Sequence, residues 1–79
     1  MSYRVLYFAS LRDRAGCALE EIAATPCNAS ALYAQLRQRH GFALTQSALR
    51  VAVNGEFASW QRALRDGDEV AFIPPVSGG

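Results

Sequence analysis

The sequence predicts a single α+β domain, in which a mixed sheet of about five strands carries one main helix across one face. The 79 residues allow one thin core, because a chain of this length buries only ~60–65% of the surface that its unfolded form exposes. Five short strand patterns surround one long helical pattern over residues 28–41. Hydrophobic residues make up 51% of the chain and charged residues 19%, which favours a packed domain over a disordered chain.

The first predicted strand covers residues 3–8. Residues 18–24 could form a strand or a helix, and the strand is favoured, pairing with the first at an edge of the sheet. Side chains of the first strand alternate between two faces. The inward face carries Tyr3, Val5 and Tyr7, and the outward face carries Arg4, Leu6 and Phe8. Residues 11–16 are predicted to form a short polar connection of about one helical turn, which ends at Gly16.

The main helix has clear signals at both ends. Asn28 is a preferred N-cap, because its side chain accepts a hydrogen bond from an unpaired amide of the first turn. An apolar stripe with helical spacing follows, consisting of Ala29, Leu32, Tyr33 and Leu36. Gly41 ends the helix, and Phe42 is expected to fold back onto the last turn. His40 lies in that turn, where positive charge suits the helix dipole, so its position accounts for it without a catalytic role.

Three further strands complete the predicted sheet. Residues 49–53 alternate with Val51 and Val53 inward, and Asn54-Gly55 indicates a two-residue hairpin that returns through residues 56–58. The last strand, residues 69–73, points Val70 and Phe72 inward and is apolar on both faces, as is the first strand. These two strands are therefore expected to be central neighbours. This order of elements is that of the β-grasp, or ubiquitin-like, fold.

Composition excludes several classes of function. A net charge of +1 offers no general attraction for nucleic acid or for an acidic membrane surface. All eight basic residues are arginine, so the chain has no lysine for a Schiff base or for phosphate binding. One histidine and two separated cysteines, Cys17 and Cys27, do not predict a metal site. The sequence has no signal peptide or transmembrane pattern, which predicts a cytoplasmic protein.

The last six residues, Pro74-Pro75-Val76-Ser77-Gly78-Gly79, form the most informative segment. The two prolines cannot donate hydrogen bonds to a sheet, so they end the last strand in a stiff, extended exit. Six residues at ~3.3 Å each carry the terminus up to ~20 Å from the domain. Gly78 and Gly79 have no side chains and can enter a narrow tunnel. We therefore expect a β-grasp domain over residues 1–73 and a flexible tail over residues 74–79 that presents its carboxylate to another protein.

An apolar surface is predicted close to this tail. Leu6, Phe8 and Ile73 have outward parity on the two strands that are expected to lie side by side. An exposed apolar cluster on a small domain usually marks an interface, although residues 42–48 or the end of the second strand could instead cover it. The interface is favoured, because a partner that grips the tail must cover this surface. Arg37 and Arg39 lie on the helix side and are interpreted as a solvated face.

Several segments of the chain match a known family. Its end, Pro-Pro-Val-Ser-Gly-Gly, follows a turn and strand that begin at Asp66-Gly67-Asp68-Glu69-Val70. The opening residues 5–9 and the central residues 51–56 agree as well. With these segments the chain resembles the small subunits of molybdopterin synthase, which are sulfur carriers, over its whole length. The related thiamine sulfur carriers share the Gly-Gly end but usually lack the Pro-Pro-Val that precedes it.

The resemblance implies that the Gly79 carboxylate is the reacting group. An adenylyltransferase of the ubiquitin-activating type would use ATP to adenylate it. Sulfur from a cysteine desulfurase or a rhodanese-type donor would then give a Gly79 thiocarboxylate. The tail, from Pro74 and Pro75 through Val76, Ser77 and Gly78, would insert into the large subunit of molybdopterin synthase. There the sulfur would pass to cyclic pyranopterin monophosphate to build the molybdopterin dithiolene.

The family pattern also implies a heterotetramer of two small and two large subunits, and no permanently bound cofactor. Two alternatives stay open beside it. The chain could carry sulfur for thiamine or cysteine synthesis, or act as a ubiquitin-like protein modifier. It could also be a passive ubiquitin-like interaction module whose tail is never activated.

Overall fold

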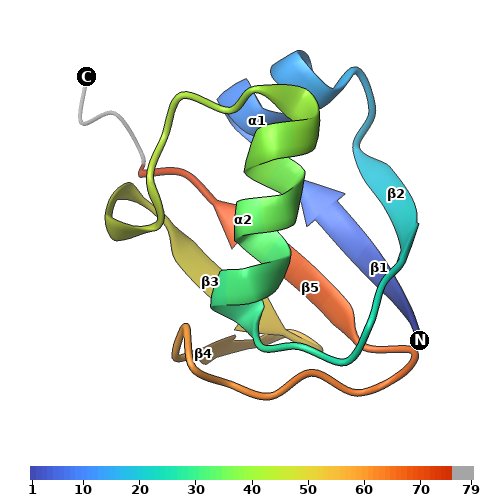
Figure 1. The fold of residues 1–79 in the computed structure, drawn as a ribbon. Coiled ribbons are helices and arrows are strands. Elements are labelled where there is room, and N and C mark those ends of the chain that lie inside the picture. Colours follow the sequence, from blue (N-terminus) through green and yellow to red (C-terminus); the bar gives the residue numbers. More distant parts are fainter. Residues whose placement is uncertain (76–79) are drawn as a thin grey trace.

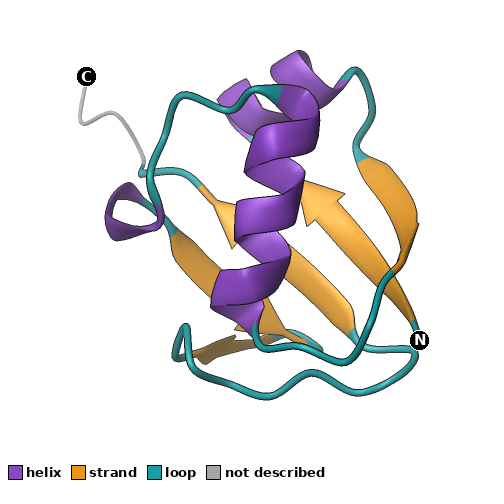
Figure 2. Ribbon diagram, viewed as in Figure 1, coloured by secondary structure: helices purple, strands orange, loops and turns teal. Residues whose placement is uncertain are grey.

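The computed structural model describes residues 1–75 of the chain. Its elements follow in the order β1 (Ser2–Tyr7), α1 (Ala9–Ala15), β2 (Leu19–Ala23), α2 (Ala29–His40), a short 3₁₀ helix (Gln46–Ala48), β3 (Arg50–Val53), β4 (Glu56–Ala58) and β5 (Glu69–Ile73). The strands form one five-stranded sheet in the order β2-β1-β5-β3-β4. Helix α2 lies across one face of this sheet, and α1 lies beyond one of its ends (Figures 1 and 2).

Strand pairing confirms the predicted β-grasp arrangement. β1 and β5, which come from opposite ends of the described chain, are parallel neighbours, with Val5 opposite Val70 and Tyr7 opposite Phe72. The other three pairings are antiparallel, and β2 and β4 form the two edges. β5 therefore has a hydrogen-bonded strand on each side.

The core lies between α2 and the inner face of the sheet. Every side chain predicted to point inward is buried: Tyr3, Val5, Tyr7, Val51, Val53, Val70 and Phe72. From α2, the predicted stripe of Ala29, Leu32, Tyr33 and Leu36 packs against them. Aromatic rings dominate the contact, with the Tyr33 ring centroid 5.1 Å from that of Phe72. Such pairs add about 0.5–1.5 kcal/mol beyond the burial of their area.

Both ends of α2 are as predicted. The Asn28 side chain accepts a hydrogen bond of 2.8 Å from the Ala31 amide. Gly41 has a φ of +73°, which favours glycine, and its amide donates to the Arg37 carbonyl. Phe42 then turns back into the core and is only 3% exposed.

The segment between β1 and β2 differs from the prediction. β1 ends at Tyr7, Phe8 is the N-cap residue of α1, and α1 has two turns where about one was expected. Tertiary contacts explain the extra turn. Leu11 is buried, and the Arg14 Nε atom donates to the His40 carbonyl at the end of α2. Residues 9–15 have little helical periodicity of their own, so the sequence indicated only about one turn of this helix and its end at Gly16.

Asn54 and Asp68 link the hairpin turn at residues 54–55 to the turn that precedes β5. Asn54 and Gly55 both have positive φ, as the predicted two-residue hairpin requires. The Asn54 side chain donates to Asp68 Oδ1 at 2.9 Å and accepts from the Glu69 amide at 3.0 Å. Asp68 Oδ2 accepts a further hydrogen bond from the Arg65 amide at 2.7 Å. This bond from Arg65 and the one from Asn54 outweigh the effect of burial, so the pKa of Asp68 lies below its usual value.

Candidate functional site

The predicted tail begins at the end of the best-supported strand. β5 ends at Ile73, after which Pro74 is half-buried and Pro75 is exposed. Since β1 and β3 hold β5 from both sides, the tail starts from a fixed point. Val76, Ser77, Gly78 and Gly79, which include the predicted reacting group, lie outside the described residues.

An apolar row crosses the outer face of the sheet, opposite α2. The strand register places one residue of each strand side by side: Leu19, Leu6, Ala71, Ala52 and Phe57. Leu19 is 42% exposed and Phe57 is 71% exposed, whereas Ala52 and Ala71 in the middle are 9% exposed. We call this set the outer row. It makes one apolar band that spans all five strands.

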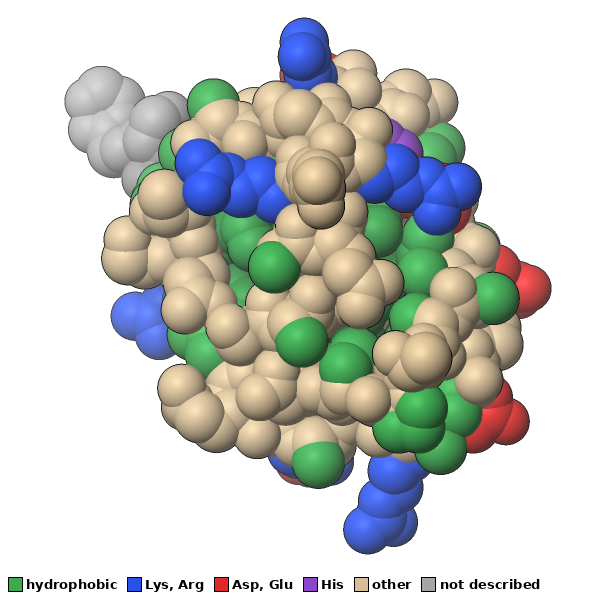
Figure 3. All heavy atoms as spheres, viewed as in Figure 1, with side chains coloured by type: hydrophobic (Ala, Val, Ile, Leu, Met, Phe, Trp, Pro, Cys, Tyr) green, Lys and Arg blue, Asp and Glu red, His purple; other side chains and the backbone are tan. Residues whose placement is uncertain are grey.

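A charged row runs beside the outer row. Arg4 on β1 stands opposite Glu21 on β2 and Glu69 on β5. The outer face is therefore apolar in one band and charged in the next. On the α2 side, by contrast, hydrophobic side chains occur in small separate groups between arginines and polar atoms (Figure 3).

The three residues predicted to form the interface lie together on this outer face. Leu6 and Ile73 are half-buried and Phe8 is 43% exposed, although Phe8 follows β1 and does not belong to it. All three line one shallow groove of about 260 Å³, together with Phe57, Ala71 and Glu69. Their predicted outward orientation is confirmed, and neither residues 42–48 nor the end of β2 covers Phe8. Their role in binding a partner stays a prediction.

Phe57 is the most exposed large hydrophobic residue of this surface, and the sequence interpretation did not include it. The sequence does contain a pattern that predicts the outward position of Phe57. In a two-residue hairpin at Asn54-Gly55, Phe57 pairs with Ala52, which has outward parity because Val51 and Val53 point inward. Leu19 was missed in the same way, because its pairing with Leu6 depends on the register of β1 and β2.

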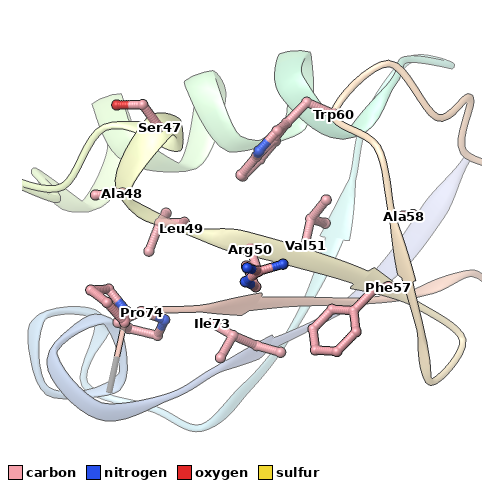
Figure 4. A pocket seen from close by; sticks show the side chains of 11 residues that line it. Ser47, Ala48, Leu49, Arg50, Val51, Phe57, Ala58, Trp60, Ile73 and Pro74 are labelled. Carbon is pink, nitrogen blue, oxygen red and sulfur yellow. The ribbon is translucent and has the colours of Figure 1, made fainter. Parts of the chain in front are cut away.

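A second, larger groove lies beside the exit of the tail. It has a volume of about 520 Å³, and Leu49, Arg50, Phe57, Trp60, Pro74 and Pro75 are among its lining residues. Arg50 projects from β3 near the middle of this groove, with Phe57 toward one end and Pro74 toward the other (Figure 4). Ile73 and Phe57 line both grooves, so the two form one continuous surface around the start of the tail.

A polar cluster on the inner side of the sheet joins β1, β2 and α2. Glu20 Oε1 accepts a hydrogen bond from the Tyr7 hydroxyl at 2.8 Å and lies 2.9 Å from His40 Nε2. Burial raises the pKa of Glu20, but the bonds from Tyr7 and His40 outweigh it, and the net shift is downward. His40 is thus fixed by Glu20 as well as by its place at the helix end. None of the three residues is among those that line either groove.

Within residues 1–75, His, Cys, Asp and Glu side chains form no group of three or more that could hold a metal ion. Cys17 and Cys27 are free thiols, both partly buried. No helix in this part of the chain combines the length and apolar character needed to cross a membrane. What the described residues supply is a rigid starting point for the tail and an apolar surface around it.

Comparisons with known proteins agree with this geometry. Residues 5–79 match the model of the ThiS family. The chain is 42% identical to the molybdopterin synthase sulfur carrier subunit of Escherichia coli K12, over 96% of this chain and 98% of that protein. The structure is similar to that of SAMP1 from Haloferax volcanii, with a TM-score of 0.84 and 28% identity over all of both chains. It is also similar to a chain in the complex of subunits 1 and 2 of molybdopterin-converting factor from Helicobacter pylori, with a TM-score of 0.70 and 25% identity over all of both chains.

Proposed function

The chain belongs to the ThiS family, and from this membership we propose that it is the sulfur carrier subunit of a molybdopterin synthase. The observation that carries the proposal is its 42% identity, over nearly the full length of both chains, to a sulfur carrier of that name. The Pro-Pro-Val-Ser-Gly-Gly segment supports it, since the related thiamine carriers usually lack the Pro-Pro-Val. We place the protein in the cytoplasm, where reducing conditions preserve a thiocarboxylate.

The reaction begins at the Gly79 carboxylate, which is a poor electrophile until one oxygen becomes a good leaving group. A ubiquitin-activating-type adenylyltransferase transfers AMP from ATP to this carboxylate and releases pyrophosphate. A persulfide sulfur, supplied by a cysteine desulfurase or a rhodanese-type donor, displaces the AMP. Reductive cleavage of the resulting sulfur–sulfur bond by a thiol leaves the Gly79 thiocarboxylate.

The charged tail then delivers its sulfur inside the large subunit. Gly78 and Gly79 pass through a narrow channel because they have no side chains, and the thiocarboxylate sulfur forms a bond to carbon of cyclic pyranopterin monophosphate. Water then cleaves the bond between this sulfur and the Gly79 acyl group and restores the Gly79 carboxylate. A dithiolene has two sulfurs, so two charged carriers are consumed for each pterin. In this proposal the chain binds no permanent cofactor and works within a heterotetramer of two small and two large subunits.

The described residues of the carrier orient and hold the tail, while the partners perform the catalysis. β5 fixes the point from which the tail leaves, and Pro74 and Pro75 keep its first part extended. The outer row and the groove around Phe8 provide apolar area for whichever partner takes the tail. Because the same surface surrounds the tail exit, the activating enzyme and the large subunit have to bind in turn.

Mass spectrometry of the intact protein tests the proposal. Carrier isolated from cells should include a form that is heavier by the exchange of one oxygen for sulfur. This form, with the cognate large subunit, should convert cyclic pyranopterin monophosphate to molybdopterin, whereas carboxylate carrier should not. Failure of the sulfur-charged form to do so would overturn the assignment. Lack of ATP–pyrophosphate exchange with every cognate activating enzyme would favour a passive interaction module.

A protein modifier is the second candidate, and one observation favours it. The chain is similar over its full length to SAMP1, a small archaeal modifier protein. In that case Gly79 would be joined to lysines of other proteins through its carboxylate. Immunoblots of cell extracts, probed for the carrier, would then show covalent high-mass adducts that survive reduction and denaturation.

A further inference from the structure

The groove beside the tail exit has an unusual distribution of charge. Its walls are largely apolar and include Trp60, Phe57, Pro74 and Pro75. Of the described residues that line it, Arg50 alone carries a charge. The neighbouring groove has an acidic group instead, Glu69. The charged side chains that line the two grooves therefore have opposite signs, although both grooves are lined by Phe57 and Ile73.

Arg50 is exposed and held in place without an acidic partner of its own. Its guanidinium carbon lies 5.9 Å from the centre of the Phe57 ring, and its backbone pairs with Ile73. Among residues 1–75 it takes part in no ion pair, whereas Arg39 lies near Glu20. A guanidinium held against an aromatic ring loses less side-chain freedom when it binds a carboxylate than a mobile one does.

We propose that Arg50 receives a carboxylate side chain from the large subunit when that subunit takes the tail. The inference rests on the proposed function, which supplies the partner. Continuity is the first argument, since Pro74 and Pro75 form the rim of the groove and any protein holding the tail passes over it. Charge is the second, because an arginine within an apolar interface requires an acidic counterpart.

The test compares Arg50 with Arg65, an exposed arginine in the turn before β5, at the opposite end of that strand from the tail exit. The full-length wild type, Arg50→Gln, Arg50→Glu, Arg50→Lys and Arg65→Gln are titrated with the cognate large subunit by calorimetry at several salt concentrations. Arg50→Gln keeps most of the side-chain stem but not the charge. Arg50→Lys keeps the charge but not the planar guanidinium.

We expect Arg50→Gln to weaken binding by about tenfold or more and Arg50→Glu by a larger factor, with a flatter salt dependence in both. Arg50→Lys should lie between the wild type and Arg50→Gln, and Arg65→Gln should bind like the wild type. Equal binding by the wild type and Arg50→Gln overturns the role of Arg50 and leaves the proposed function standing. Failure of the wild type to bind overturns the proposed function and this inference together.

A second copy of the chain is the competing occupant, and sedimentation of the free protein separates the two cases. A wild-type dimer that Arg50→Glu abolishes would overturn the proposal, because the groove would then hold another carrier. A monomer at the same concentrations, together with the loss of affinity for the large subunit, supports it.

Discussion

Asn54 and Asp68 show that part of a familiar sequence motif has a structural role. The Asp-Gly-Asp turn supported the family resemblance, yet in the structure its second aspartate points inward and bonds to Asn54 and to the Arg65 amide. Asn54 and Asp68 are 14 positions apart, so only the folded sheet brings them together. The motif therefore fixes where β5 begins, and through β5 it fixes where the tail leaves.

Asp68→Ala should lower the free energy of unfolding by about 1–3 kcal/mol, because donors from Asn54 and Arg65 lose their acceptor. The pKa of Asp68 is lowered in the folded state, so its contribution is present above the unfolded value of 3.8 and is lost as pH falls below it. Urea unfolding at pH 7 and near pH 3 measures both effects. Asp66→Ala is the comparison, because Asp66 is exposed and its carboxylate accepts a bond from the Ser2 amide at 2.7 Å, so a smaller loss is expected there. An equal loss in the two variants would contradict the role of Asp68.

Phe8 and Phe57 are expected to be anchors for the partner and not for the core. Phe8→Ala and Phe57→Ala should each weaken binding to the large subunit by about 2 kcal/mol or more, the size typical of an interface anchor. Both rings are exposed, so each truncation should cost far less stability than the ~3–5 kcal/mol of a buried phenylalanine. Thermal melts and calorimetric titrations separate the two effects.

Val5→Ala is the matched control on the inner face. Val5 is fully buried, so its truncation should lower the free energy of unfolding by ~1.5–3 kcal/mol and leave the affinity of the folded protein unchanged. If Phe8→Ala unfolded the domain while Val5→Ala affected only binding, the assignment of the two faces would be wrong.

At the scale of elements, the sequence predicted the features that depend on residues close together in the chain. Asn28, Gly41 and the Asn54-Gly55 turn act within a few positions of themselves, and both ends of α2 and the hairpin were found where expected. α1 was underestimated because Leu11 and Arg14 stabilise it through contacts with distant elements. The cluster around Glu20 was not predicted for the same reason, because its members come from three different elements.

The residues of the candidate site also differ in whether the sequence alone could predict them. Leu6, Phe8 and Ile73 were found from strand parity alone, whereas Phe57 and Leu19 join the outer row only through the register between strands. Arg50 acquires its significance from the groove around it, which no periodicity reveals. The chemistry itself, at Gly79, was inferred from the motif and the family and lies outside the described residues.

Tyr7→Phe should destabilise the protein more than Tyr33→Phe does, although both remove a buried hydroxyl. The Tyr7 hydroxyl donates to the Glu20 carboxylate, while the Tyr33 hydroxyl donates to the neutral Leu44 carbonyl. Bonds to charged groups contribute about 1.5–3 kcal/mol and neutral ones about 0.5–1.5 kcal/mol. Because the pKa of Glu20 is lowered, the excess effect at Tyr7 should shrink as pH falls below 4.5. Chemical denaturation at pH 7 and near pH 3 measures the loss of stability in each variant. Equal losses for Tyr7→Phe and Tyr33→Phe at both pH values would contradict the prediction.

Most of the core lies apart from the surfaces proposed for partners. The core lies between α2 and the inner face of the sheet, whereas the outer row and the groove around Phe8 lie on the opposite face. The groove beside the tail exit is where the two meet, because Leu49 and Val51 belong to the core and also line it. This separation predicts that the tail can be altered without loss of the fold.

Deleting Gly79 should abolish sulfur transfer, because the terminal carboxylate then lies on Gly78 and reaches ~3.3 Å less far from the domain. The melting temperature should stay unchanged, because residues 1–73 keep their packing. Gly78→Val should have the same effect, since a β-branched side chain restricts the backbone and obstructs a narrow channel. Molybdopterin formation with the purified large subunit measures transfer. Synthesis at the wild-type rate by the deletion variant would be incompatible with a carrier that works through Gly79.

The parallel pairing of β1 with β5 has a consequence for how the protein is made. β1 opens the described chain and β5 closes it, so a nascent chain has no complete sheet until residue 73 has left the ribosome. A product interrupted before β5 would lack the strand that joins β1 to β3 and would expose apolar segments. We therefore expect that only chains translated at least as far as the start of the tail complete the sheet.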